Sequence, residues 1–297
     1  MTFLTPSDEG RSRAFRAAAS LAGLAVSVRD TRPWRWVSGA RSLDLYTDEG
    51  RRLPVADPAG HLMTLSCGSG LHLARTALRA QGYDVWVERA GGEPAPDSPV
   101  ARLLVADADV KPNIMALNRL RDRVDRMRRG GLARQPADPG LLSGACETAG
   151  GRMRVLHCDE VMRLASIDAM AHAIVDLDER RRRELAGRPR PRAHADVVDP
   201  HGQYAVLLAA DDSTESWLRV GEAMAAVYLA AADAKLSVGM LSAPTENPVT
   251  RAQLVRLLGD GSIPALVLHL GSAAGQPPEA AARLFTSALA GAAGAVA

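Results

Sequence analysis

The chain has 297 residues, 47% of them hydrophobic, and its 36 basic and 34 acidic side chains give a net charge of +2. This near balance argues against a dedicated nucleic-acid-binding protein, which usually carries a clear basic excess. The length suits one large domain or two smaller ones around a substantial core. The sequence shows no basic start followed by an apolar run, and no apolar stretch long enough to cross a bilayer. We therefore expect a cytoplasmic protein without a signal peptide or a membrane span.

Cysteine and histidine usage gives no sign of a metal site. Cys67, Cys146 and Cys158 are an odd number without CxxC spacing, which is typical of a reducing compartment. The seven histidines do not pair at ligand spacing, so the sequence predicts no zinc site. The glycine-rich nucleotide loops and the nucleophile elbow of α/β-hydrolases are also absent from the sequence.

The first half of the chain is organised around a pair of tryptophans. Trp34 and Trp36 alternate with polar residues, as do Leu43 and Leu45 after a short turn, and this pattern predicts a β-hairpin. The tryptophans either nucleate the core of the hairpin or, with the arginines before them, hold a planar anionic ligand. The other elements expected here are helices at 12–24, 61–80 and 113–129 and strands at 83–88 and 102–106.

A stretch with two prolines, 130–144, is expected to link the two halves. Beyond it, Asp159 and either Ser213 or Thr214 are candidate helix N-caps, and Gly259 is a candidate helix stop. The predicted spans are strands at 153–157, 204–209, 236–241 and 264–270 and helices at 159–178, 214–234 and 250–258.

Two basic segments each leave two interpretations open. The proline-containing loop 180–201 is either a solvated surface loop or an electropositive gate that attracts NADPH, an acidic substrate or nucleic acid. The basic helical stretch 119–129 is either a surface face with pairs such as Asp122–Arg126 or, in a fused dimer, a phosphate-binding segment.

The halves also show a faint duplication. Segments 68–82 and 221–235 have the same length, each holds a predicted helix, and each precedes a predicted strand. Two copies of a helix–strand–strand unit predict a pseudo-dimer within one chain. We place the halves at 1–110 and 111–297, the second carrying the short basic lid loop.

Three motifs occur in order along the chain. The first, Ser27 to Trp36, reads SVRDTRPWRW; the second, Asp57 to Gly70, reads DPAGHLMTLSCGSG. The third runs through 219–271 and includes LSAPTENP. In order and spacing these motifs resemble the nitroreductase superfamily, and specifically its Acg-type actinobacterial branch.

The resemblance implies an α+β fold in which a central mixed sheet is flanked by helices and the chain is an internally duplicated pseudo-dimer. It implies FMN at the interface of the halves, and NAD(P)H as the reductant. In a ping-pong cycle, members of the family pass a hydride to the flavin and then to a nitro compound, a quinone or a related acceptor. Ordinary members are homodimers, so further self-association of this chain stays open.

The resemblance also carries a set of cofactor-binding positions onto this sequence, while no catalytic residue is assigned. Their family counterparts surround the flavin phosphate, which needs cationic donors, and the flavin ring, which needs hydrogen-bond donors along its edge. The expected cofactor-binding residues are Ser27, Arg29, Asp30, Arg32, Trp34, Arg123, Arg126, Gly221, Glu222, Ser242 and Pro244.

Several of these positions depart from the family pattern. The His, Asn and Gln of the first motif are here Arg29, Asp30 and Arg32, and the family's closing Pro-Arg-Arg-Pro segment is absent. Asp30 only accepts hydrogen bonds, so it repels a phosphate, while the two arginines either restore positive charge or pair with Asp30. The alternative to an FMN enzyme is therefore a flavin-poor or flavin-free member of the fold that acts as a binding or regulatory protein.

Overall fold

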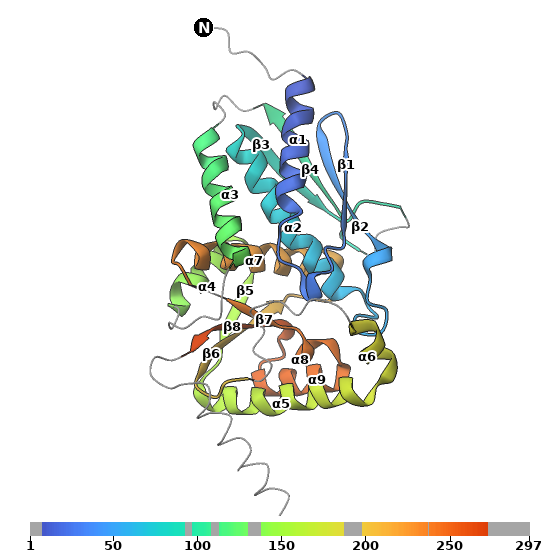
Figure 1. The fold of residues 1–297 in the computed structure, drawn as a ribbon, viewed down its shortest axis with the longest axis vertical. Helices are drawn as coiled ribbons and strands as arrows, with labels where there is room; N and C mark the ends of the chain where they lie inside the picture. The colour runs from blue at the N-terminus through green and yellow to red at the C-terminus, as the bar shows by residue number, and fades with distance from the viewer. Residues whose placement is uncertain are drawn as a thin grey trace, which may run out of the picture.

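The computed structural model describes residues 8–92, 97–107, 113–129, 138–186, 198–236 and 238–272. These residues form two antiparallel sheets of four strands, each with its own helices (Figure 1). The α+β class is confirmed. The expected single mixed sheet is not what the described residues form, because every strand pair is antiparallel and two helices pack between the sheets.

The first sheet, sheet A, has the strand order β1-β2-β4-β3. The predicted tryptophan hairpin is confirmed, with Trp36 opposite Leu45. The leucines at 43 and 45 alternate inward and are fully buried against the long helix α2. The elements up to the connecting helix α3 are α1 (Asp8–Ala22), η1 (Val28–Asp30), β1 (Trp34–Ser38), β2 (Ser42–Thr47), η2 (Glu49–Arg51), α2 (His61–Ala80), β3 (Tyr83–Arg89), β4 (Ala101–Asp107) and α3 (Ile114–Arg129).

The second sheet, sheet B, has the order β5-β6-β8-β7. Helix α7 packs on one face of it and helix α5 on the other. Its elements are α4 (Pro139–Thr148), β5 (Arg152–Val155), α5 (Cys158–Leu177), α6 (Glu179–Leu185), β6 (Gly202–Ala209), α7 (Thr214–Asp233), β7 (Gly239–Leu241), α8 (Ala243–Glu246), α9 (Pro248–Leu258) and β8 (Ile263–Ser272).

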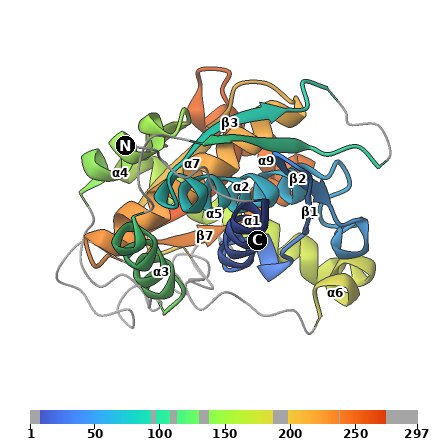
Figure 2. The same ribbon diagram turned by 90° about the horizontal axis from the view of Figure 1, so that it is seen from above.

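The two sheets have the same topology, which supports the predicted duplication. β2, β4 and β3 occupy in sheet A the places that β6, β8 and β7 occupy in sheet B. Helices α2 and α7 precede corresponding strands and both have 20 residues. Figure 2 shows these two helices side by side in the middle of the molecule, with α3 and α6 at opposite ends. The boundary near residue 110 stays a prediction.

The two central helices cross at a pair of glycines. Gly68 and Gly221 are each the eighth residue of their helix. A Cβ at Gly221 would lie 1.8 Å from the carbonyl oxygen of Leu65, and a Cβ at Gly68 would lie 2.1 Å from that of Leu218. Since no side chain fits at either position, the backbones touch and the crossing is symmetric.

Several local predictions are wrong in detail. The expected linker 130–144 runs into α4, which begins with Pro139 in the first turn behind Asp138 as N-cap. Helix α5 begins behind His157 rather than Asp159, since His157 and Glu160 form a capping box. Part of the expected loop 180–201 is α6, while its residues 187–197 lie outside the described residues.

The caps of the last helices agree better with the sequence. Ser213, one of two candidates, caps α7 by accepting from Ser216 N, and Gly259 ends α9 with a positive φ of 71°. None of the described helices combines the length and apolar character needed to cross a bilayer.

Candidate functional site

The first motif forms a strained loop between α1 and β1. Arg29, Asp30 and Arg32 all have positive φ, at 56°, 50° and 47°. Such angles are uncommon outside glycine and persist only where neighbouring groups hold them. Here Ser27 Oγ accepts the N–H of Arg32 at 3.1 Å, and Ser66 Oγ of α2 accepts that of Val28 at 3.0 Å. The loop thereby turns Arg29 toward the second half.

Arg29 joins the first motif to the third. Its Nε and Nη2 donate to the two carboxylate oxygens of Glu246 at 3.0 and 3.1 Å, across 217 positions of sequence. The two side chains are 13% and 1% exposed, so the pair is largely desolvated. A planar bidentate pair of this kind is the strongest geometry available to an arginine.

A second buried acid lies near this pair. Burial raises the pKa of Asp168, on α5, to about 6, against the lowering effects of His172, the N–H of Val198 and the charge of Arg29. His172 Nδ1 lies 3.5 Å from Asp168 Oδ2. Asp168 was not anticipated from the sequence, since it lies on a helix that carries none of the three motifs.

The other arginines of the expected set are also paired. Arg32 donates to the carboxylate of Asp30 at 2.9 and 3.2 Å on the surface. For Arg32, pairing with Asp30 is thus the alternative that the structure shows. Arg123 lies 2.8 Å and Arg126 3.5 Å from the carboxylate of Asp233. Arg126 also donates to the carbonyl oxygen of Ala232, so both cations close the C-terminus of α7, where the helix dipole favours them.

Glu222 and Gly221 lie deep at the junction of the halves. The carboxylate of Glu222 is fully buried, 3.0 Å from Arg75 of α2 and 2.6 Å from Arg89 of β3. Its neighbour Gly221 forms the helix crossing. Both residues therefore bind the second half to the first.

Trp34, Ser242 and Pro244 take three different places. Trp34 is half-buried and packs with the first-half core beside Gly70, which agrees with the hairpin-core interpretation. Ser242 precedes α8, and its carbonyl oxygen accepts from the hydroxyl of Thr245 at 2.9 Å. Pro244 occupies the first turn of α8. The eleven expected positions thus do not converge on one place, and the cofactor-binding set stays a prediction.

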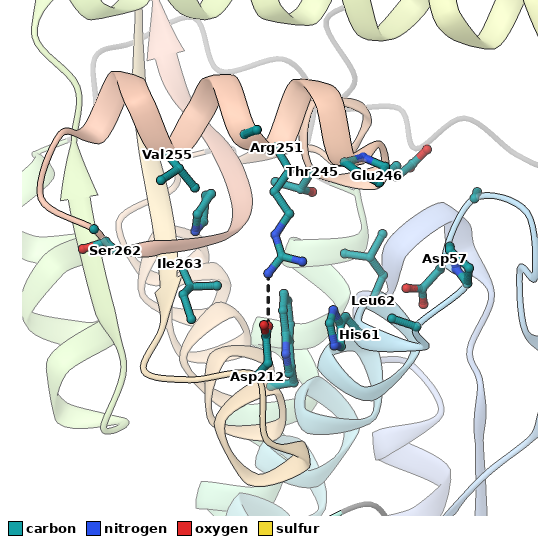
Figure 3. A pocket seen from close by; sticks show the side chains of 18 residues that line it. Asp57, His61, Leu62, Asp212, Thr245, Glu246, Arg251, Val255, Ser262 and Ile263 are labelled. Carbon is teal, nitrogen blue, oxygen red and sulfur yellow. Dashed lines mark hydrogen bonds and ion pairs between the residues drawn. The ribbon is translucent and has the colours of Figure 1, made fainter.

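A cavity of about 460 Å³ lies where the N-terminal ends of α2 and α7 meet α8 and α9 (Figure 3). One wall comes from each half, so this is a seam cavity in the sense expected of a fused dimer. Its lining residues include Asp57, His61, Leu62, Asp212, Trp217, Thr245, Glu246, Arg251, Val255, Ile263 and Pro264.

Aromatic stacking and an ion pair organise the cavity wall. The rings of His61 and Trp217 stack at 4.3 Å with 9° between their planes. Arg251 lies 5.2 Å from the centre of the Trp217 ring and donates to Asp212 at 3.3 Å. Burial and the charge of Arg251 lower the pKa of His61, so this ring is neutral at pH 7. Of these wall residues, His61 lies in the second motif and Arg251 in the third, and neither belongs to the expected cofactor-binding set.

The N-terminus of α2 already has an acidic partner. Asp57 Oδ2 accepts the N–H of Met63 at 2.8 Å. Burial raises the pKa of Asp57, while the N–H groups of Met63 and Leu62 and the charge of Arg52 lower it. An external anion would have to displace this carboxylate to use the positive end of the helix.

A smaller cavity, of about 260 Å³, adjoins the first at Ala59. Two arginines line it: Arg35 lies 4.5 Å over the Tyr46 ring, and Arg52 pairs with Glu49 at 3.3 Å. Its volume is below the usual range for ligand sites, about 300–1,000 Å³.

Comparison with known proteins gives relatives over most of the chain. The chain is 29% identical over 300 residues to "Putative NAD(P)H nitroreductase Rv3131" of Mycobacterium tuberculosis. This alignment covers 86% of the present chain and 84% of the relative. It is also 26% identical over 311 residues to "Putative NAD(P)H nitroreductase acg" of the same organism, and this alignment covers 90% of the present chain and 92% of that relative. No family model matches the chain.

The arrangement does not fit the FMN that the resemblance implies. A flavin phosphate needs cations that are not already neutralised, yet Arg29, the least exposed arginine of the expected set, is held by the buried carboxylate of Glu246. Arg32, Arg123 and Arg126 pair with the more exposed Asp30 and Asp233. The seam cavity has one arginine among its described lining residues, which is too few for the two charges of a phosphate.

Proposed function

This chain is related to the Acg-type proteins of the nitroreductase superfamily, and on that premise we propose that it is a flavin-free, small-molecule-binding member of the fold. The observation that carries the proposal is the bidentate ion pair between Arg29 of the first motif and Glu246 of the third. In this pair the two side chains bind each other rather than a cofactor. The seam cavity beside Glu246 then serves as the binding site.

The energetics favour the closed pair over a flavin phosphate. Separating Arg29 from Glu246 would leave a carboxylate with a 1% exposed side chain without its cation. Removing one partner of such a buried pair typically costs about 3–5 kcal/mol. A phosphate contact would have to recover that energy before it contributed any affinity.

An absorbance scan of the purified full chain tests the proposal. We expect no flavin bands, either as isolated or after incubation with excess FMN followed by desalting. Flavin recovered at a near-stoichiometric ratio would overturn it.

The second candidate is an FMN-dependent NAD(P)H oxidoreductase that reduces a nitro compound or a quinone. The names of the two relatives, which are matched over 84% and 92% of their lengths, favour it. Its cofactor site would be the eleven expected positions, with the chain acting in the cytoplasm as an internal pseudo-dimer.

Steady-state assays separate the two candidates. The oxidoreductase candidate requires NAD(P)H oxidation with a quinone or nitroaromatic acceptor that exceeds the rate given by the same concentration of free FMN. The flavin-free candidate requires rates equal to that control with both NADH and NADPH.

A further inference from the structure

The walls of the seam cavity suit a flat apolar ligand. Leu62, Val255, Ile263 and Pro264 line it with aliphatic carbon, and the indole of Trp217 adds a buried aromatic ring. A volume of about 460 Å³ lies within the range of small-molecule sites. It accommodates a body of one or two fused rings rather than a dinucleotide.

Two carboxylates of the cavity are already engaged by the protein. Asp57 accepts the N–H of Met63 at the start of α2, and both oxygens of Glu246 accept from Arg29. The charge of Glu246 is therefore matched by Arg29, and the carboxylate of Asp57 is directed toward the N–H groups at the start of α2.

The one arginine among the described lining residues of the cavity is less fully engaged. The hydrogen bond of Arg251 goes to Asp212, whose side chain is 62% exposed. Figure 3 shows the Arg251 side chain reaching from α9 into the space between Ile263 and Leu62. An ion pair with so exposed a partner is weak and readily exchanged.

We infer that the seam cavity binds an aromatic carboxylate of one or two rings, an inference that rests on the flavin-free function proposed above. The ligand carboxylate replaces Asp212 as the partner of Arg251, whose planar guanidinium matches a carboxylate bidentately. The ring body packs on Leu62 and Ile263.

Calorimetric titration of the full chain tests this inference with three matched probes: 2-naphthoate, its neutral amide and 2-naphthylmethylammonium. We expect saturable binding of the naphthoate and affinity about tenfold lower or worse for the amide, since charge-assisted hydrogen bonds are roughly twice as strong as neutral ones. The ammonium probe should not bind.

Substitutions identify the groups responsible. Arg251→Gln should reduce naphthoate affinity about tenfold or more and bring it to the level of the amide, whereas Arg251→Lys should retain part of the difference. Arg256→Gln, an exposed arginine on the same helix, is the matched control and should change nothing.

The inference would be overturned by equal affinity for acid and amide, or by preference for the ammonium probe. It would also be overturned if Arg251→Gln bound naphthoate as tightly as wild type, or if no probe gave saturable binding. The absorbance scan distinguishes this failure from that of the proposed function. A colourless protein that ignores naphthoate rejects only the ligand class, whereas a yellow one rejects the function itself.

Discussion

The two halves share one strand order but bury their sheets differently. In sheet A, residues of β3 alternate between buried and open positions, and Trp86 is 56% exposed. In sheet B, seven of the eight residues of β6 are buried, because α7 packs on one face while α5 and α9 pack on the other. The two sheets therefore share a topology without sharing the extent to which their residues are buried. Sheet B, in the second half, is covered on both faces, whereas sheet A leaves one face of β3 open.

The largest effect is expected where the halves share their backbones. Gly221→Ala places a methyl group 1.8 Å from the carbonyl oxygen of Leu65, so the two helices must separate. We expect a loss of about 5 kcal/mol or more in the free energy of unfolding, measured by urea titration. Gly144→Ala, in α4 with open space around it, is the control and should be neutral or slightly stabilising. A Gly221→Ala protein of near wild-type stability would refute the crossing.

A somewhat smaller loss is expected from the buried acid that ties the halves together. Glu222→Gln leaves Arg75 and Arg89 without their carboxylate in the interior. The free energy of unfolding should fall by about 3–5 kcal/mol. Glu215 lies about two turns before Glu222 on the same helix and pairs with Arg219 on the surface. Glu215→Gln should therefore cost less than about 1 kcal/mol. Equal costs for the two substitutions would contradict the burial difference.

The acid on α5 should make the junction sensitive to pH. Because the pKa of Asp168 is raised to about 6 from 3.8, the folded state holds its proton more tightly, and stability falls as pH rises through this window. Asp168→Asn removes this effect, so relative to wild type it should gain about 2 kcal/mol between pH 4.5 and pH 7.5. Asp176→Asn, on the exposed side of the same helix, is the control. If the difference in unfolding free energy between Asp168→Asn and wild type did not change with pH, the carboxylate of Asp168 would not be destabilising in its buried position.

The smallest effect is expected on the open face of sheet A. Trp86→Ser removes a large side chain that is 56% exposed, so the free energy of unfolding should change by no more than about 0.5 kcal/mol. Leu207→Ala, at a fully buried position of β6, should cost about 2–5 kcal/mol in the same assay. A large loss for Trp86→Ser would show that another surface covers this face.

Most of the fold could be predicted from local patterns. The span 61–80 was predicted to the residue, because its apolar spacing and Gly82 define both the helix and its stop. The start of α4 departs from the predicted linker because Pro139, which is typical of a linker, is also favoured in the first turn of a helix. The pairing of Gly68 with Gly221 was visible as equal spacing, but their contact depends on tertiary packing.

The candidate site was predictable in its motifs and not in its pairings. The resemblance places Arg29 among the expected cofactor-binding residues, but its partner Glu246 is 217 positions away and no local pattern links the two. Trp217 and Arg251 lie on helices α7 and α9, which pack on opposite faces of sheet B, so only the tertiary fold brings the two side chains to one cavity wall. Charge composition alone could not tell paired arginines from unpaired ones.

The most direct measurement is a titration of FMN fluorescence with the purified full chain at low salt, where phosphate contacts are strongest. With Arg29 held by the buried carboxylate of Glu246, we expect no saturable quenching at micromolar protein concentrations. Stoichiometric, saturable quenching would show that these pairs open for a phosphate, and would contradict the flavin-free function.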